Sequence, residues 1–146
     1  MLKLKQFSHP TEKTTPRNDL WNNCSMSINF LGLRSLIYPA PNLQASKAWW
    51  KKTLGKDPYF DDGGYVGFDL GGYELGLNSF SQTLKGPITY IGVESVQAAV
   101  DSLVADGARL LGDPTEVGGG IVVADLESPE GEVFGVIYNP HFKIRE

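Results

Sequence analysis

The chain has 146 residues, a formal net charge of −4 at pH 7 and a single cysteine, Cys24. This length is typical of one domain, and the acidic balance argues against a nucleic-acid partner, which would favour a basic patch. No apolar run approaches the ~18 residues of a membrane span, and no signal-like start is present. One cysteine excludes an internal disulfide and favours a cytoplasmic location, which is the location that we expect.

Residues 1–29 differ from the rest of the chain. They are rich in Lys, Thr, Asn and Ser and show no sustained periodicity. We expect an N-terminal arm there, flexible alone or ordered only against something else. An inert extension is the alternative, and a single domain is predicted over residues 30–146.

The first predicted strand and helix follow the arm. Residues 31–38 read as a strand, and Asn42 and Gly55 are a good helix N-cap and C-terminal signal for a helix reaching about residue 54. Trp49 and Trp50 are adjacent and cannot face the same way, so one is expected in the core and the other at an interface.

Residues 67–78 predict a β-hairpin around the pair Gly71-Gly72, after a short strand at Tyr59-Phe60. A two-residue turn places Asp69 opposite Glu74 and Gly67 opposite Gly76. Side chains alternate along strands, so one face is apolar and needs a helix over it. The other face is polar around two glycines that leave room, and consists of Tyr65, Gly67, Asp69, Glu74, Gly76 and Asn78.

A second unit of the same kind begins after Gly86-Pro87. Residues 88–93 predict a strand, Ser95 caps a helix that ends at Gly107, and residues 108–111, 121–126 and 133–138 predict three strands. Gly118–Gly120 reads as a loop. If residues 128–131 form a four-residue turn, Ala124 lies opposite Gly135, and these small residues match Gly67 and Gly76. The inward face of this unit is then Ile88, Tyr90, Val122, Ala124, Leu126, Val133, Gly135 and Ile137.

The repeat predicts an α+β fold of two tandem βαβββ modules, residues 30–85 and 86–140. Two such copies resemble the vicinal oxygen chelate superfamily, which includes glyoxalase I, bleomycin-resistance proteins, extradiol dioxygenases and methylmalonyl-CoA epimerase. The residues that carry the resemblance are Pro41-Asn42-Leu43, Trp49-Trp50, Leu54-Gly55 and Ser128-Pro129-Glu130-Gly131-Glu132. The resemblance implies a U-shaped mixed sheet around a cleft, helices outside, and a homodimer.

Enzymes of this superfamily hold a divalent metal on the first and last strands of the modules. Carried over one at a time, those places are Ser35, Gly76, Ile88 (or Thr89) and Gly135, and none is a good ligand for a transition metal. The two histidines, His9 and His141, lie elsewhere. We therefore predict no metal and no cofactor.

Asp69 and Glu74 are then the candidates for acid–base chemistry, since adjacent like charges raise one pKa. Two solvated carboxylates beside a turn are the alternative. The first hypothesis is a metal-independent protein that binds a cationic or amphiphilic organic molecule, in the manner of bleomycin-resistance proteins. The second is a metal-dependent lyase, isomerase or dioxygenase of the superfamily, and the third a regulatory module. The predicted ligand-binding residues are Ser35, Ile37, Tyr65, Gly67, Asp69, Glu74, Gly76, Asn78, Ile88, Tyr90, Val122, Ala124, Val133, Gly135 and Ile137.

Overall fold

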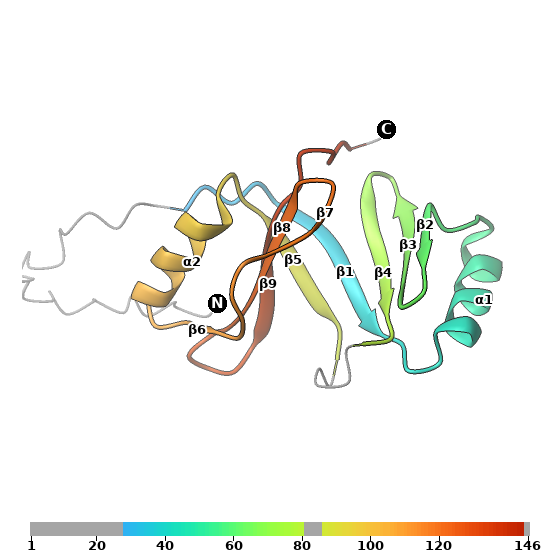
Figure 1. Cartoon of the computed structure of the whole chain (residues 1–146), viewed down its shortest axis with the longest axis horizontal. Coiled ribbons are helices and arrows are strands. Elements are labelled where there is room, and N and C mark those ends of the chain that lie inside the picture. The colour runs from blue at the N-terminus through green and yellow to red at the C-terminus, as the bar shows by residue number, and fades with distance from the viewer. Residues whose placement is uncertain (1–27, 81–85, 145–146) are drawn as a thin grey trace, which may run out of the picture.

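The structure is a computed structural model that describes residues 28–80 and 86–144 (Figure 1). Most of the predicted arm, with Cys24 and His9, lies outside the described residues. The boundary predicted between residues 29 and 30 therefore stays a prediction. No helix within residues 28–80 or 86–144 is long and apolar enough to cross a membrane.

Each predicted module contains one helix, and its strands follow the expected order. The first comprises β1 (Leu33–Pro39), α1 (Leu43–Leu54), β2 (Phe60–Asp62), β3 (Tyr65–Leu70) and β4 (Tyr73–Asn78). The second comprises β5 (Ile88–Gly92), α2 (Val96–Ala105), β6 (Arg109–Leu110), β7 (Thr115–Gly118), β8 (Ile121–Glu127) and β9 (Val133–Tyr138). The α+β class is confirmed, and β7 is an additional strand that the sequence did not predict.

Both helices begin at the predicted capping residues. The side chain of Asn42 accepts a hydrogen bond from the Ala45 amide at 3.1 Å, and that of Ser95 accepts from the Ala98 amide at 3.2 Å. These bonds satisfy amides that the first helical turn leaves without an intrahelical partner. Gly55 ends α1 in the left-handed conformation, with φ of 66°.

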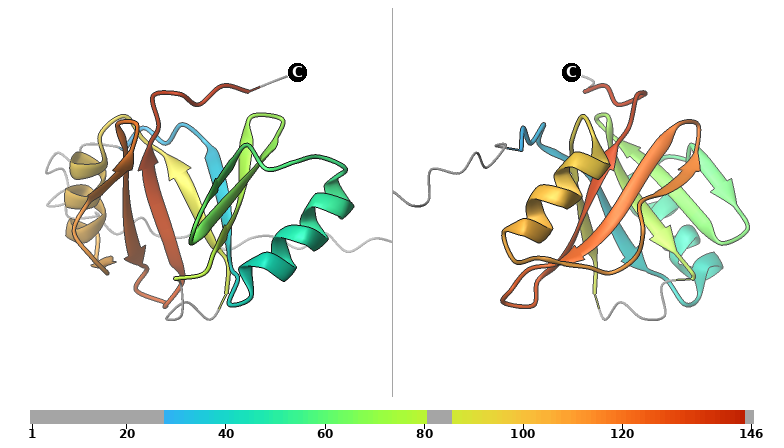
Figure 2. Two further views of the ribbon diagram at one scale, coloured as in Figure 1. Left: turned by 45° about the vertical axis from the view of Figure 1, so that its right-hand side comes forward. Right: turned by 60° about the vertical axis from the view of Figure 1, so that its left-hand side comes forward.

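The strands form one curled mixed sheet in the order β2-β3-β4-β1-β5-β9-β8-β6, and β7 pairs with β8. The two modules join where β1 runs antiparallel to β5, with Ile37 opposite Ile88. Figures 1 and 2 show a half-barrel with α1 and α2 on its outer, convex side. The concave side is thus built within one chain, across both modules.

Each helix covers its own apolar cluster on the convex side. The first cluster contains Val66, Phe68 and Leu77 with Leu43 of α1, and Trp50 stacks on Tyr38 at 5.9 Å between ring centroids. The second consists of Val93, Val96, Ala99, Val100, Ala124, Leu126 and Val136. Trp50 is therefore the core tryptophan of the adjacent pair, whereas Trp49 is 58% exposed.

The first hairpin has the predicted register. Asp69 lies opposite Glu74 and Gly67 opposite Gly76. The turn residues Gly71 and Gly72 have φ of 67° and 96°, which most other residues avoid. The polar face of β3 and β4 therefore lies on the concave side, as expected.

The register predicted for the second hairpin is wrong by one residue. Asp125, not Ala124, lies opposite Gly135, and Glu127 lies opposite Val133. The connection runs from residue 128 to residue 132 and is one residue longer than the predicted turn. Within it, the Ser128 amide donates to the Glu132 carbonyl at 2.8 Å. A one-residue shift exchanges the two faces of a strand. The side chains of Val122, Ala124 and Leu126 consequently pack on the α2 side and not in the cleft.

The C-terminal segment after β9 crosses one end of the half-barrel towards the β3–β4 turn (Figure 1). The Phe142 ring lies 5.7 Å from the Tyr73 ring, between centroids, and the Arg34 guanidinium lies 3.8 Å from the centre of the Phe142 ring. His141 Nε2 lies 2.8 Å from the Gly119 carbonyl oxygen at the β7–β8 turn. This segment therefore connects the two sides of the curved sheet at that end.

Candidate functional site

One row of paired residues crosses the concave face from β8 to β3. Residues paired across neighbouring strands share a face, so the side chains of this row point to the same side as Tyr65. In order, the row is Asp125, Gly135, Tyr90, Ser35, Glu74 and Asp69.

Glu74 is held by two tyrosine hydroxyls. The Tyr65 hydroxyl donates to Oε1 at 2.5 Å, and the Tyr59 hydroxyl makes a short hydrogen bond to Oε2. Burial, followed by the effect of the Glu74 charge and hydrogen bond, raises the pKa of both tyrosines well above the usual value. Both hydroxyls therefore remain donors near neutral pH, and they fix the orientation of the carboxylate.

A second carboxylate on this face, Asp125, was missed by the sequence analysis. The Tyr90 hydroxyl donates to its Oδ1 at 2.6 Å, and Tyr90 itself is only 7% exposed. Burial, then the hydrogen bond to Asp125, raises the pKa of Tyr90. The alternation in β8 could have revealed Asp125. Val122, Ala124 and Leu126 form the more apolar face of this strand, which is the face that a helix would cover. Asp125 then belongs to the opposite, concave face.

The predicted glycine floor is not open. A Cβ at Gly76 would collide with the Tyr65 hydroxyl, and a Cβ at Gly135 would collide with the Tyr90 ring. At Gly67 the nearest atom would be Glu74 Oε2, at 2.9 Å. The prediction that these glycines leave volume for a guest is wrong, because side chains of the same face already occupy the space above them.

Ser35 lies in the middle of the row, between Glu74 and Tyr90. It is 8% exposed, and its hydroxyl has no hydrogen-bond partner within residues 28–80 and 86–144. No fully buried side-chain nitrogen or oxygen of the described residues lacks a partner, so the Ser35 oxygen is reached by solvent. The central hydroxyl of the concave face is therefore available to a bound molecule.

The other predicted site residues are divided between turns and an apolar cluster. Asp69 Oδ1 accepts from the Gly72 amide at 3.2 Å, and Asn78 Oδ1 accepts from the Phe80 amide at 2.9 Å, so both side chains stabilise turns. The predicted positions Ile37, Ile88, Val133 and Ile137 pack together with Tyr90, Ile121 and Val123. The concave face thus joins apolar surface to two carboxylates held by tyrosines.

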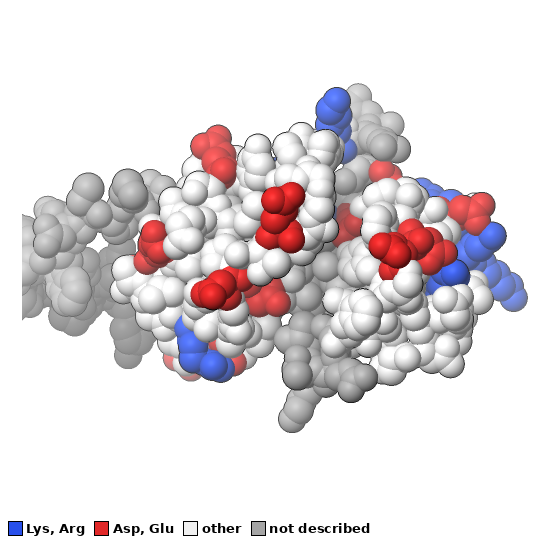
Figure 3. All heavy atoms as spheres, in the orientation of Figure 1, with Lys and Arg blue, Asp and Glu red and all other residues white. Residues whose placement is uncertain are grey.

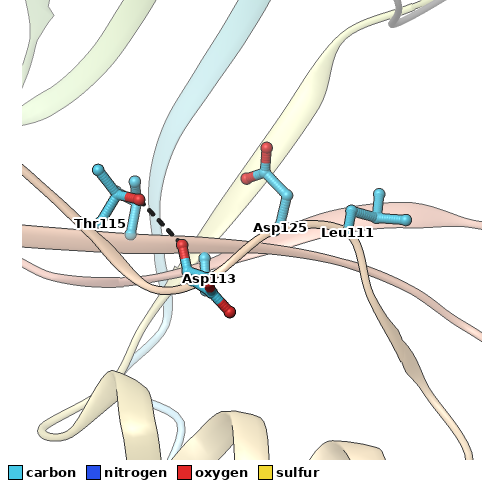
Figure 4. Close-up of a pocket in the computed structure, with 7 residues that line it drawn as sticks. Leu111, Asp113, Thr115 and Asp125 are labelled. Carbon is cyan, nitrogen blue, oxygen red and sulfur yellow. Dashed lines mark hydrogen bonds between the residues drawn. The ribbon is translucent and has the colours of Figure 1, made fainter.

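A shallow pocket of about 170 Å³ lies between β8 and the segment that connects β6 to β7 (Figure 4). Figure 4 shows the Asp125 carboxylate turned away from the side chain of Asp113. Pockets that enclose a drug-sized ligand are usually ~300–1,000 Å³. We therefore place the candidate site on the concave face, which Asp125 also borders. The residues that line the shallow pocket are Leu111, Gly112, Asp113, Thr115, Val123, Ala124 and Asp125.

The row also corrects the positions at which the resemblance to the superfamily placed the metal ligands. Ser35 pairs with Glu74 and Tyr90, whereas Gly76 and Ile88 pair with Ile37, two residues further along β1. Of the row's positions on β1, β4, β5 and β9, which are Ser35, Glu74, Tyr90 and Gly135, only Glu74 carries a carboxylate or imidazole. In the described part of the chain, no three His, Cys, Asp or Glu residues gather into a metal-binding group. These residues do not fit the donor set that the superfamily's metal requires.

Charged side chains are unevenly distributed on the outer surface. Figure 3 shows acidic side chains scattered over the drawn face, whereas many of the Lys and Arg side chains gather beside α1. Two of them, Lys47 and Lys51, pair with Asp61 and Asp57 at 2.8 and 2.5 Å. These exposed pairs lie on the convex side, away from the concave row.

Solved structures show where this fold occurs. A Mn(II)-bound glyoxalase from Novosphingobium aromaticivorans is 19% identical, with a TM-score of 0.65; the match covers 82% of this chain but only 42% of that one. A methylmalonyl-CoA epimerase from Streptomyces coelicolor, with 2-nitronate-propionyl-CoA, is 14% identical over 77% of this chain and 99% of that one, with a TM-score of 0.60. A structure described as an NAD-dependent benzaldehyde dehydrogenase from Legionella pneumophila is 15% identical over 75% and 98%, with a TM-score of 0.58.

No known protein-family profile and no curated protein matches the sequence. The similarity to the solved structures is at the level of fold, since all three identities are below 20%. Glyoxalase and methylmalonyl-CoA epimerase are members of the superfamily that the repeated βαβββ pattern resembles. The chain therefore has the vicinal oxygen chelate fold, with both of its modules in one half-barrel.

Proposed function

We propose that this protein binds a small organic molecule with a cationic end on its concave face, without a metal ion. The observation that carries the proposal is Glu74. Its carboxylate is partly buried, is oriented by Tyr59 and Tyr65, and has no cationic partner among the described residues. Removing a carboxylate from water without a cation costs free energy, which a bound cation would offset.

Aromatic rings around Glu74 support a cationic guest. Phe60 lies opposite Gly67 on the same face, and its ring centroid is 6.1 Å from that of Tyr65. Ring faces attract organic cations by about 0.5–2 kcal/mol each, more where water is excluded. The partly exposed side chains of the neighbouring apolar cluster would contact the apolar part of the same molecule, and these are Ile37, Ile121, Val123 and Val133. The expected ligand is thus amphiphilic, with its charge at Glu74.

Asp69 has a smaller part in this proposal than the sequence suggested. It lies opposite Glu74, but its carboxylate also caps the β3–β4 turn through the Gly72 amide. A role for the Asp69–Glu74 pair in acid–base chemistry stays a prediction. Its direct test is hydrolase, lyase and isomerase screening of the Glu74→Gln variant beside the wild type.

A metal-dependent lyase, isomerase or dioxygenase is the second candidate. It is favoured by the fold and by the Mn(II) bound to the similar glyoxalase. Glu74 would then be one ligand, and the others would have to come from outside the row or from another chain. Elemental analysis of the purified protein separates the candidates, because the second requires a stoichiometric transition metal.

The experiment for the first candidate is a thermal-shift screen of aromatic and aliphatic organic cations. Ligands that stabilise the wild type should stabilise Glu74→Gln much less, while neutral analogues should not distinguish the two. Glu130→Gln is the matched control, since Glu130 is exposed on the β8–β9 connection. If no cation stabilises the wild type, or if Glu74→Gln responds equally, the proposal is wrong.

We also propose that the protein is a homodimer and is located in the cytoplasm. The first proposal is supported by the exposure of Trp49 (58%), whose ring meets Trp50 edge-on, because a large exposed aromatic side chain is common at interfaces. The second is supported by the single cysteine. Light scattering and cell fractionation test them.

A further inference from the structure

We infer that the concave site takes an organic dication, such as a linear diammonium compound, with one charge at Glu74 and the other at Asp125. This inference rests on the proposed function and extends it from one anchor to two. The two carboxylates belong to the same row, Glu74 on β4 in the first module and Asp125 on β8 in the second.

The geometry of the row sets the scale of the ligand. Moving from β4 to β8 crosses β1, β5 and β9, which is four steps between neighbouring strands. At about 4.8 Å a step, the path along the sheet is roughly 19 Å, and the curl of the half-barrel shortens the direct path. Glu74 and Tyr90 both pair with Ser35, so the tyrosine that bonds to Asp125 lies only two strands from Glu74. An extended aliphatic chain can therefore reach both carboxylates.

Neither carboxylate has a cation of its own in the described part of the chain. The three ion pairs there are Lys47–Asp61, Lys51–Asp57 and Arg109–Glu127. Arg34 lies near this face at Gly92, but its guanidinium packs over the Phe142 ring and donates to the Leu33 carbonyl at 3.1 Å. Tyrosine hydroxyls orient Glu74 and Asp125 but do not neutralise them, so each carboxylate can pair with a positive charge of the ligand.

Ser35 offers a polar contact between the two carboxylates. The residue is 8% exposed and lies at the middle of the row. Its hydroxyl has no hydrogen-bond partner in residues 28–80 and 86–144, and its oxygen is accessible from the concave face, because no fully buried side-chain oxygen or nitrogen there lacks a partner. A hydroxyl both donates and accepts. A chain that links two ammonium groups across the row would pass Ser35, where a central amine or hydroxyl would complete its hydrogen bonding.

The test is isothermal titration of the full chain with diaminoalkanes of increasing length and with monoaminoalkanes of the same length. We expect one length to bind best, at least about tenfold more tightly than its monoamine, as a second charged anchor should provide. Asp125→Asn should remove this difference. Asp125→Glu should retain it, and Asp113→Asn, at an exposed neighbouring carboxylate, is the matched control.

The outcomes separate this inference from the proposed function. If monoamines bind in a Glu74-dependent manner but diamines bind no better at any length, the dication is refuted and the cation site stands. If the difference survives in a folded Asp125→Asn variant, Asp125 is not the second anchor and the inference is also refuted. If no amine binds the wild type, both the inference and its cation site fail. Thermal melting establishes that each variant is folded.

Discussion

Gly135→Ala tests whether Tyr90 lies over the concave face as the structure shows. The new Cβ would overlap two carbons of the Tyr90 ring and lie 3.0 Å from a third. Tyr90 cannot move aside freely, because it is 7% exposed and its hydroxyl is bonded to Asp125 at 2.6 Å. Overpacking a buried position typically costs about 1–3 kcal/mol. We therefore expect the free energy of unfolding to fall by about that amount.

Urea unfolding followed by tryptophan fluorescence measures this loss. Gly112→Ala is the control, because no atom lies within 4 Å of its added Cβ; it should be neutral or slightly stabilising. In a Tyr90→Ala background, Gly135→Ala should cost little, since the obstructing ring is gone. An unchanged urea midpoint for Gly135→Ala in the wild-type background would refute the placement of Tyr90, and with it the orientation of Asp125.

Three further predictions concern ionisation, the central hydroxyl and assembly. Because the pKa of Tyr65 and of Tyr90 is raised on folding, these groups add stability that is complete below about pH 10 and is lost as pH rises above it, by at most ~1.4 kcal/mol per pH unit each; Tyr65→Phe should flatten this loss in urea titrations at several pH values. Ser35→Ala should leave the melting temperature nearly unchanged, since no hydrogen bond is lost, but should weaken any ligand that bonds to the hydroxyl; a large fall in melting temperature without ligand would show that Ser35 has a structural partner. Light scattering at micromolar concentration should give a dimer, and Trp49→Ser should shift it towards monomer; a monomeric wild type would contradict the interface.

The first hairpin could be predicted in full because its turn admits one register. Gly71-Gly72 requires positive φ at two successive positions, and this set the pairing of Asp69 with Glu74. The connection between β8 and β9 has no such constraint. Its predicted length was one residue short, which moved Val122 and Ala124 to the wrong face and hid Asp125.

Site geometry was harder to predict than the fold because it depends on side-chain directions. Gly67, Gly76 and Gly135 were correctly placed on strands, but sequence does not show that Tyr65 and Tyr90 lean over two of them. The same rings form the hydrogen bonds that orient Glu74 and Asp125. Small residues in a sheet can therefore mark the place where a large neighbour lies, and not only an empty cavity.

The most direct test of the central claim is calorimetric titration of chelator-treated protein with the best cation found by screening. Removing any metal first excludes metal-assisted binding, and elemental analysis verifies the removal. The account predicts that wild type binds without metal and that Glu74→Gln binds at least about tenfold more weakly, because a hydrogen bond to a charged group contributes about 1.5–3 kcal/mol. Equal affinity of the two proteins, or binding by wild type only after a divalent transition metal is restored, would contradict it.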